Sequence, residues 1–249
     1  MAAEQVNSLA GPAKNLYTAF RRFCECELKH DIIVVYIMRY RKIPDETVRR
    51  LPIYLRGLLF LSKQGRQNAS SRNLADFLSV NPAQIRKDFS YFGDFGTRGV
   101  GYNIETLIKE IKKILRLNIV HKAALVGVGN LGSAVLAYPG FAVYGFDVAA
   151  AFDNNPKKIG RKVRGITIES VSNLNVLKKR KINIGIITVP RDAAQETANA
   201  LVRADVRGIL NFSPCYITVP KKTKVITIDI GMDLARLPYY MPAGWSVNE

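Results

Sequence analysis

The chain has 249 residues, of which 48% are hydrophobic and 23% are charged. This composition excludes a mainly disordered protein, and the length is sufficient for two domains that each bury a core. The formal net charge of +17 indicates a polyanionic partner such as nucleic acid, but a generally basic, solvated surface explains the same charge equally well. A local motif has to decide between the two.

The first 42 residues contain no recognisable secretory signal and no membrane span. Their longest apolar run, Ile32–Met38, is flanked by charged residues and is much shorter than the roughly 20 residues that cross a bilayer. We therefore expect a cytoplasmic protein without a membrane partner, and we treat residues 1–42 as an extension of unknown structure. The three cysteines are interpreted as free thiols, because Cys24, Cys26 and Cys215 are too few and too irregularly spaced for a disulfide framework or a zinc site.

Residues 70–92 carry the pattern of two short helices joined by a tight turn. The second helix is expected from Pro82 to about Phe92, because Asn-Pro-x-Gln at 81–84 combines an N-cap, a first-turn proline and a capping box. Its apolar side chains fall on one arc, with Asp88 at the edge of that arc, and its polar and basic side chains point the other way. This pattern matches a helix-turn-helix whose second helix enters the major groove of DNA.

The expected DNA contacts come from this outward face, from the start of the first helix and from the loop that follows. An ordinary helical hairpin with a solvated outer face is the alternative. The candidate DNA-binding residues are Ser70, Ser71, Gln84, Arg86, Lys87, Ser90, Tyr91 and Arg98.

The segments on either side of this pair of helices complete a winged domain. Residues 93–101 place four glycines around Arg98, which favours a β-turn wing beside the recognition helix. Upstream, Pro44 to Gly65 is expected to form a supporting helix that Pro52 kinks or divides. We therefore expect a winged helix-turn-helix domain over residues 43–101.

A second motif, ALVGVGNLG at 124–132, indicates a dinucleotide-binding turn. The strand Ala123–Val126 leads into Gly-x-Gly-x-x-Gly, a helix follows over Leu131–Tyr138, and the next strand ends in Asp153. A carboxylate in this position accepts hydrogen bonds from the adenosine ribose and repels a 2′-phosphate, which favours NAD(H) over NADP(H). The cations just beyond it argue in the other direction, since they could receive a phosphate; they are Lys157, Lys158 and Arg161.

Strands and a helix alternate downstream of this motif. Strands are expected over Ile182–Val189, Gly208–Phe212 and Val225–Ile230, with a helix over Asp192–Ala204, and this order predicts an α/β domain over residues 102–230 with a Rossmann-like, doubly wound parallel sheet. Ligands of such sheets bind beyond the carboxyl ends of the strands, although plain turn chemistry explains the loops at 188–190 and 211–214 equally well. The candidate cofactor-binding residues are Gly127, Val128, Gly129, Asn130, Leu131, Gly132, Asp153, Thr188, Val189 and Pro190.

The chain offers little for a dehydrogenase. Its two histidines lie in the N-terminal extension (His30) and before the first strand, at the edge opposite the cofactor (His121), so neither is placed for proton transfer. Lysine or tyrosine could still serve, but a domain of this length leaves little chain for a substrate-binding half. We interpret the dinucleotide as a signal and expect no catalytic residues, no metal site and no enzyme. An NAD-dependent reductase and a CoA-binding regulatory protein remain as alternatives.

Several motifs together resemble the Rex family of redox-sensing transcriptional repressors, over about Ile43 to Tyr240. They are Arg50-Leu-Pro-x-Tyr54-x-Arg56, NPAQIRKDFSYFG at 81–93, Gly99-x-Gly-Tyr102, the glycine motif at 127–132, and Phe152-Asp153. The run QIRKDFSYFG is highly specific. Residues 1–42 exceed the short N-terminus that the family leads us to expect.

The resemblance implies a homodimer that binds palindromic operator DNA when NADH is scarce and leaves it when NADH binds, so that it responds to the NADH/NAD⁺ ratio. It also implies that the C-terminal segment 231–249 serves dimerisation, with a helix at about Gly231–Tyr240 that swaps onto the partner subunit. By the same resemblance, Arg56, Tyr102 and Asp229 link the two domains. From the residues alone, a cap at the end of a strand is the favoured interpretation of Asp229.

Overall fold

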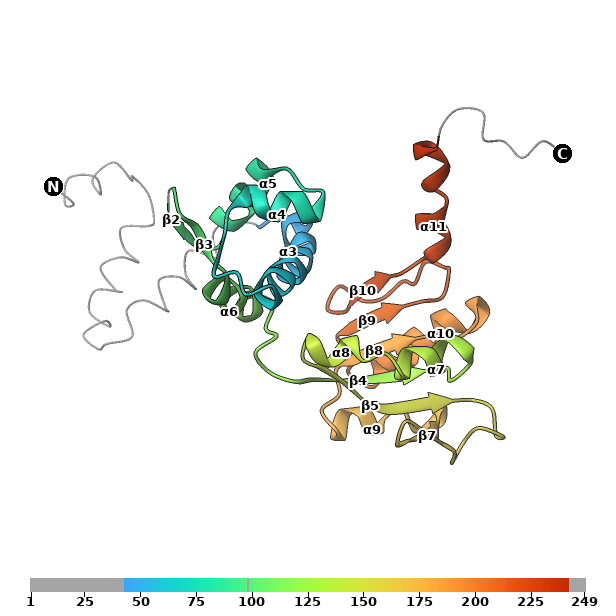
Figure 1. Cartoon of the computed structure of the whole chain (residues 1–249). Coiled ribbons are helices and arrows are strands. Elements are labelled where there is room, and N and C mark those ends of the chain that lie inside the picture. The colour runs from blue at the N-terminus through green and yellow to red at the C-terminus, as the bar shows by residue number, and fades with distance from the viewer. Residues whose placement is uncertain (1–42, 98, 242–249) are drawn as a thin grey trace, which may run out of the picture. The chain divides into compact units, whose positions relative to one another are not determined.

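The computed structural model describes residues 43–97 and 99–241, and the chain divides into two compact units after Leu115 (Figure 1). The division lies one helix later than the boundary expected at residue 101. Helix α6 (Ile104–Ile114) packs against helix α3 (Asp45–Lys63), so it belongs to the core of the N-terminal unit. The expected N-terminal extension (1–42), the end of the C-terminal tail (242–249) and Arg98 lie outside the described residues.

Helix α3 is the long support of the N-terminal unit. It buries one face in leucines, including Leu51, Leu55 and Leu58. The helix continues through Pro52 as one element, so the division expected at this proline does not occur. Proline removes one backbone donor, but the carbonyl left without it, on Val48, belongs to an exposed residue where water can replace the donor.

The two short helices predicted for the helix-turn-helix are confirmed as α4 (Ser71–Leu78) and α5 (Pro82–Ser90). Ser70 caps α4 by accepting from the Asn73 amide at 3.1 Å, and the Asn73 side chain accepts from the Ser70 amide in return. At the start of α5, Asn81 accepts from the Ala83 amide at 2.8 Å. Local capping therefore sets both helix starts.

A small antiparallel sheet forms the wing. Strand β3 (Gly101–Asn103) lies between β1 (Asn68–Ala69) and β2 (Gly96–Thr97). Gly101 has φ +94°, and a Cβ added there would lie 2.6 Å from the carbonyl oxygen of Ala69. This position accepts only glycine, because any side chain would separate β3 from β1.

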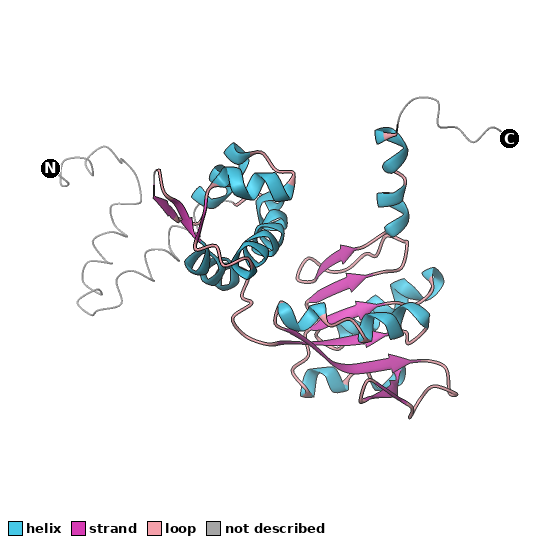
Figure 2. Cartoon of the chain, viewed as in Figure 1, coloured by secondary structure: helices cyan, strands magenta, loops and turns pink. Residues whose placement is uncertain are grey.

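The C-terminal unit is built on a seven-stranded sheet in the order β10-β9-β8-β4-β5-β7-β6. Figure 2 shows strands of this sheet in magenta and the helices in cyan. Every neighbouring pair is parallel except β6 with β7, so the expected parallel sheet is confirmed and gains an antiparallel edge. The strands are β4 (His121–Val126), β5 (Phe146–Asp153), β6 (Lys162–Val163), β7 (Ile166–Ser170), β8 (Ile184–Ile187), β9 (Gly208–Asn211) and β10 (Lys224–Thr227).

Both faces of the central strands of this sheet are buried, as a doubly wound fold requires. Alternate residues of β4 join different cores: Val126 packs in the core that contains Leu177 and Leu201, and Leu125 in the core that contains Val135. The helical elements of this unit are α7 (Asn130–Leu136), α8 (Gly140–Val143), η1 (Val171–Asn173), α9 (Val176–Lys179), α10 (Arg191–Arg203), α11 (Ile230–Leu234) and η2 (Leu237–Tyr240).

The described C-terminal segment is apolar but exposed. The single helix expected at 231–240 is instead two short elements, α11 and η2, and Pro238 lies in the first turn of the second. Its large hydrophobic residues are exposed in this chain: Ile230, Met232, Leu234, Leu237, Tyr239 and Tyr240. Among the described helices, none has the length and apolar character that a bilayer crossing requires.

The wing offers a test of the glycine requirement. Gly101→Ala is expected to lower the melting temperature of the N-terminal unit and to disturb the wing, because its Cβ would displace the β1 backbone. Gly99→Ala is the matched control: Gly99 also has positive φ (+84°), but nothing lies within 4 Å of an added Cβ, so it carries only the backbone cost of about 1–2 kcal/mol. Circular dichroism on heating compares the two, and equal losses would contradict the steric explanation.

Candidate functional site

Helix α5 presents a basic and polar surface on its outer side. Arg86, Lys87 and Ser90 are exposed, and Arg86 Nη1 donates to the Ser71 hydroxyl of α4 at 2.9 Å. Ser90 Oγ donates to the Lys87 carbonyl at 2.8 Å, which keeps this hydroxyl against the last turn of the helix. The structure therefore brings together four of the sequence-predicted DNA contacts on one face. Side chains of these types form hydrogen bonds with phosphates and with base edges.

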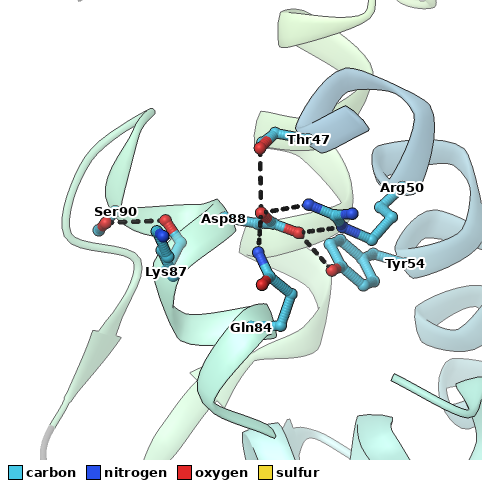
Figure 3. Close-up of polar contacts among 7 residues, drawn as sticks. All are labelled: Thr47, Arg50, Tyr54, Gln84, Lys87, Asp88 and Ser90. Atoms are coloured by element: carbon cyan, nitrogen blue, oxygen red, sulfur yellow. Dashed lines mark hydrogen bonds and ion pairs between the residues drawn. The ribbon is translucent and has the colours of Figure 1, made fainter. Parts of the chain in front are cut away.

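The inner side of α5 holds a buried charge, Asp88, which lies among polar side chains (Figure 3). Its side chain has no exposed surface. Arg50 donates to it twice, from Nε at 2.6 Å and from Nη2 at 2.9 Å. Tyr54 Oη donates at 2.5 Å, Thr47 Oγ1 at 3.0 Å and Gln84 Nε2 at 2.8 Å. Three of these four residues belong to α3, so the carboxylate joins the recognition helix to its support.

Burial alone would raise the pKa of Asp88, but the hydrogen bonds from Arg50, Tyr54, Gln84 and Thr47 outweigh it and bring the pKa down to about 2. The hydrogen bonds from Arg50 to Asp88 raise the pKa of Arg50. Burial, together with the hydrogen bond from Tyr54 to Asp88, raises the pKa of Tyr54. Because the pKa of Asp88 is lower in the folded protein, its contribution to stability is present above about pH 4 and is lost as the pH falls through about 2.

Three of the predicted DNA-binding residues, Gln84, Ser70 and Tyr91, are placed differently from the expectation. Gln84 was expected to close a capping box and to point outward, but it is half-buried and its amide donates to Asp88. Ser70 is occupied by the capping box of α4, Tyr91 is half-buried at the end of α5, and Arg98 lies outside the described residues. The sequence contained one signal for this arrangement, namely Asp88 at the edge of the apolar face of α5. A charge in that position requires hydrogen-bond donors from a neighbouring element.

An aromatic cluster fixes the wing to α5. The ring of Phe89 makes edge-on contacts with Tyr54 and Tyr102, both at a centroid distance of 5.2 Å, and with Phe95 at 6.2 Å. Tyr102, expected to link the two domains, is buried inside the N-terminal unit. The other two expected linking residues lie on separate units: Arg56 is exposed on α3, and Asp229 caps α11 by accepting from the amides of Gly231 and Met232.

The glycine motif connects β4 to α7, and each glycine has its own steric reason. Gly127 has φ +100°, and a Cβ there would meet the Thr188 backbone at 2.9 Å. A Cβ on Gly132 would lie 2.0 Å from the Gly127 carbonyl oxygen, so the helix could not approach the strand. Gly129 differs from both: nothing lies within 4 Å of its added Cβ, and its φ is −85°. Its lack of a side chain leaves open space in front of the start of α7.

Helix α7 begins in this open space without a side-chain cap, so its first amide groups are directed outward. Asn130 and Leu131, both exposed, occupy its first turn. Val128 is an exception among the predicted cofactor residues: it is buried, and its amide donates to Asp153 at 2.8 Å rather than to a ligand. Uncapped amide groups after a glycine turn are the donors that hold a pyrophosphate.

Loops at the carboxyl ends of β8 and β9 border the glycine turn. Thr188 Oγ1 donates to the Gly127 carbonyl at 2.7 Å, and Ser213 Oγ donates to the Val189 carbonyl at 2.6 Å. Within the second loop, Asn211 Oδ1 accepts from the Ser213 amide at 2.9 Å, which is ordinary turn chemistry. The structure thus joins residues 188–190 to the glycine turn, with Pro190 exposed at the start of α10.

Asp153 ends β5 beside this turn. Burial opposes its charge, but the amides of Asn155 and Val128 and the ammonium of Lys158 donate to it and lower its pKa, so the carboxylate is ionised. An anion at the end of the second strand, open space at Gly129 and an uncapped helix start together fit a dinucleotide whose adenosine ribose meets the carboxylate. The residues present suit NAD(H).

Family models match both units separately. Residues 42–90 match the model described as "Putative DNA-binding protein N-terminus", and residues 118–215 match the model described as "CoA binding domain". The first match covers α3, α4 and α5, and the second covers the glycine turn and the sheet through β9.

Full-length relatives identify the family. A redox-sensing transcriptional repressor Rex of Syntrophobacter fumaroxidans is 44% identical over 209 residues, which is 83% of this chain and 100% of the relative. The Rex repressor of Streptomyces griseus subsp. griseus is 43% identical over 203 residues, covering 81% of this chain and 80% of the relative. The chain belongs to the Rex family of redox-sensing transcriptional repressors.

Solved Rex-family structures share this fold. The repressor RSP in complex with β-NAD⁺ and operator DNA gives a TM-score of 0.75 at 36% identity, over 80% of this chain and 93% of that one. The same repressor in complex with β-NADH gives a TM-score of 0.74 at 35% identity, over 80% and 94%. The resemblance noted in the sequence is therefore confirmed, together with the α/β fold class.

Asp88 provides a test of how the recognition helix is held. Asp88→Ala is expected to cost about 3–5 kcal/mol of unfolding free energy, because it leaves the half-buried Arg50 guanidinium without its carboxylate. Urea denaturation measures this loss. Asp94→Ala, which removes an exposed carboxylate from the following loop, is the control and should change stability by less than about 0.5 kcal/mol. Similar stability of the two variants would contradict the central role of Asp88.

The glycine turn provides a second test. Gly129→Val is expected to fold normally, because the added side chain enters open space, yet to lose NADH binding because it fills the approach to the α7 amides. Gly132→Ala is the contrasting variant, expected to lower the melting temperature as well, since its Cβ conflicts with the Gly127 carbonyl. Calorimetric titration with NADH and thermal unfolding distinguish the two variants. Full NADH affinity in Gly129→Val would refute the idea that NADH reaches the α7 amides past Gly129.

Proposed function

We propose that this chain is a repressor that binds operator DNA as a homodimer through its winged helix-turn-helix unit and is released when NADH binds its Rossmann-like unit. The proposal rests on two features found in the same chain. Helix α5 is held on α3 through Asp88 and presents basic side chains outward, and the glycine turn leaves open space at Gly129 through which a ligand can reach the start of α7. Support comes from a Rex-family relative whose structure holds both β-NAD⁺ and operator DNA.

On the DNA side, we assign Arg86 and Lys87 to the operator contact, with Ser71 and Ser90 beside them. Arginine and lysine pair with guanine edges and with phosphates, and the Arg86–Ser71 bond orders the guanidinium before DNA arrives. Gln84 stays with Asp88 in this proposal and supports the helix, and Ser70 supports α4. Tyr91 and Arg98 remain proposed contacts at the end of α5 and in the wing.

On the cofactor side, we assign the pyrophosphate to Gly129, Asn130 and Leu131 at the start of α7, and the adenosine ribose to Asp153. Gly127, Gly132 and Thr188 shape the turn, while Val128 orients Asp153 through its amide. Val189 and Pro190 border the nicotinamide end. Dinucleotide bound here supplies the redox signal, since its reduced and oxidised forms differ in the charge and shape of the nicotinamide.

The exposed apolar residues of α11 and η2 support the homodimer. A run of exposed large hydrophobics on a terminal element indicates an interface with another chain, and we propose a second copy of this chain as the occupant. A symmetric dimer would present two recognition helices to a palindromic operator. Arg56, Tyr102 and Asp229 remain the proposed links between the units, and a repressor acting on operator DNA works in the cytoplasm.

A reductase and a CoA-binding regulator are the alternatives to this function. The relatives are repressors rather than enzymes, and among the described residues no histidine lies beside the glycine turn: His121 starts β4 and bonds to the Arg116 carbonyl. A CoA-binding role draws on the family model matched by residues 118–215. It would require a nucleotide with a 3′-phosphate rather than NADH to release the DNA.

Fluorescence anisotropy on a DNA fragment from the protein's own promoter region tests the proposal. NADH is expected to release the DNA and NAD⁺ to leave it bound. Arg86→Ala and Lys87→Ala should each weaken DNA binding by about tenfold or more while NADH still binds. Lys109→Ala, which removes the same charge from an exposed ion pair on α6, is the control and should bind DNA almost normally. DNA binding indifferent to NADH but sensitive to CoA would favour the alternative.

A further inference from the structure

Most hydrogen-bond acceptor positions of the Asp153 carboxylate are already occupied by donors of the protein itself. Its Oδ2 accepts from the Val128 amide at 2.8 Å and from Lys158 Nζ at 3.1 Å, and its Oδ1 accepts from the Asn155 amide at 2.8 Å. Each carboxylate oxygen has two acceptor positions, so one position remains, on Oδ1. Asp153 therefore has room for a single hydroxyl of the adenosine ribose, where an unpaired carboxylate could accept from two.

The Lys158 ammonium changes the charge that this end of the site presents. The ion pair with Asp153 is partly sheltered, with side chains that are 34% and 6% exposed, so solvent screens it only in part. An unpaired carboxylate repels a phosphate on the ribose, and this repulsion is the usual reason why such sites reject NADP(H). A cation 3.1 Å from that carboxylate offsets the repulsion and still has two N–H donors beyond the bond to Asp153.

The neighbouring sequence reinforces the positive charge. Residues 154–165 contain no acidic residue and carry five cations: Lys157, Lys158, Arg161, Lys162 and Arg164. Lys158 differs from the rest of this group in the structure, because its Nζ donates to Asp153, while Lys157 is exposed and contributes its backbone amide to Asn155 Oδ1. The residue best placed to act on a ribose phosphate is thus Lys158.

We propose that Lys158 is a specificity-determining residue of the dinucleotide site: it moderates the repulsion between Asp153 and a 2′-phosphate, so that the Asp153–Lys158 pair sets the discrimination between NADH and NADPH. The inference rests on the proposed function, since it takes the glycine turn as the site of NADH. It concerns the ratio of two affinities, which the presence of the glycine turn does not determine.

Calorimetric titration of the full-length protein with NADH and with NADPH tests this role. Lys158→Gln is expected to raise the Kd for NADPH by about tenfold, the effect of roughly one charge-assisted hydrogen bond, and the Kd for NADH by less than about threefold. Lys158→Arg keeps the charge and should keep the ratio of the unaltered protein. In the unaltered protein, the ratio of the Kd for NADPH to that for NADH should rise with salt, because salt screens the attraction of the phosphate.

Lys157→Gln is the matched control, since it removes the same charge one residue away from a side chain that makes no contact with Asp153. It should change the ratio by less than about twofold. An equal weakening of both nucleotides by Lys158→Gln, or an equal change of the ratio by Lys157→Gln, would overturn the inference. Failure of the unaltered protein to bind NADH would refute the proposed function itself, whereas NADH binding with an unchanged ratio in Lys158→Gln refutes only the role of Lys158.

Discussion

The architecture of the DNA-binding unit depends on one buried charge. Asp88 has no access to water, and an ionised carboxylate in that position is tolerated only when donors surround it. Its donors come from α3 and from Gln84 of its own helix, so the charge is satisfied only when α5 lies against α3 in one orientation. That orientation leaves Arg86 and Lys87 on the outer side. The buried face thus determines which side chains of α5 face outward.

The cofactor unit achieves its arrangement by leaving side chains out. A dinucleotide is held mainly by backbone amides, and these are reached only where no Cβ intervenes. Gly127 and Gly132 let the turn and the helix close on each other, whereas Gly129 keeps the approach free. Asp153 then serves two purposes at once, since it accepts from the Val128 amide, which fixes the turn, and retains one acceptor position for a ligand. The contact between Lys158 and Asp153 therefore involves a carboxylate that both fixes the turn and faces the ligand.

The sequence predicts the features that depend on residues close together in the chain, and it does not predict those that depend on contacts between distant residues. The helix starts after Ser70 and Asn81 and the strand–turn–helix around Gly127 are set by residues a few positions apart, and they are found as expected. The partners of Asp88 lie 34 to 41 residues earlier on α3, and the Val128–Asp153 bond spans 25 residues. No periodicity shows such contacts. The division after Leu115 was missed for the same reason, because the placement of α6 is decided by its packing on α3.

The buried charge also limits how NADH can act on DNA binding. Coupling between two ligands of one protein is typically 1–3 kcal/mol, and it is reciprocal. A hydrogen bond to a charged group contributes about 1.5–3 kcal/mol, so disrupting even two of the five bonds at Asp88 would exceed that coupling. Under the proposed function, a rearrangement of the recognition helix within its unit would therefore cost more than a typical coupling supplies. A change in the spacing of two intact recognition helices breaks none of these bonds, and a palindromic operator is sensitive to this spacing because its half-sites lie a fixed number of base pairs apart.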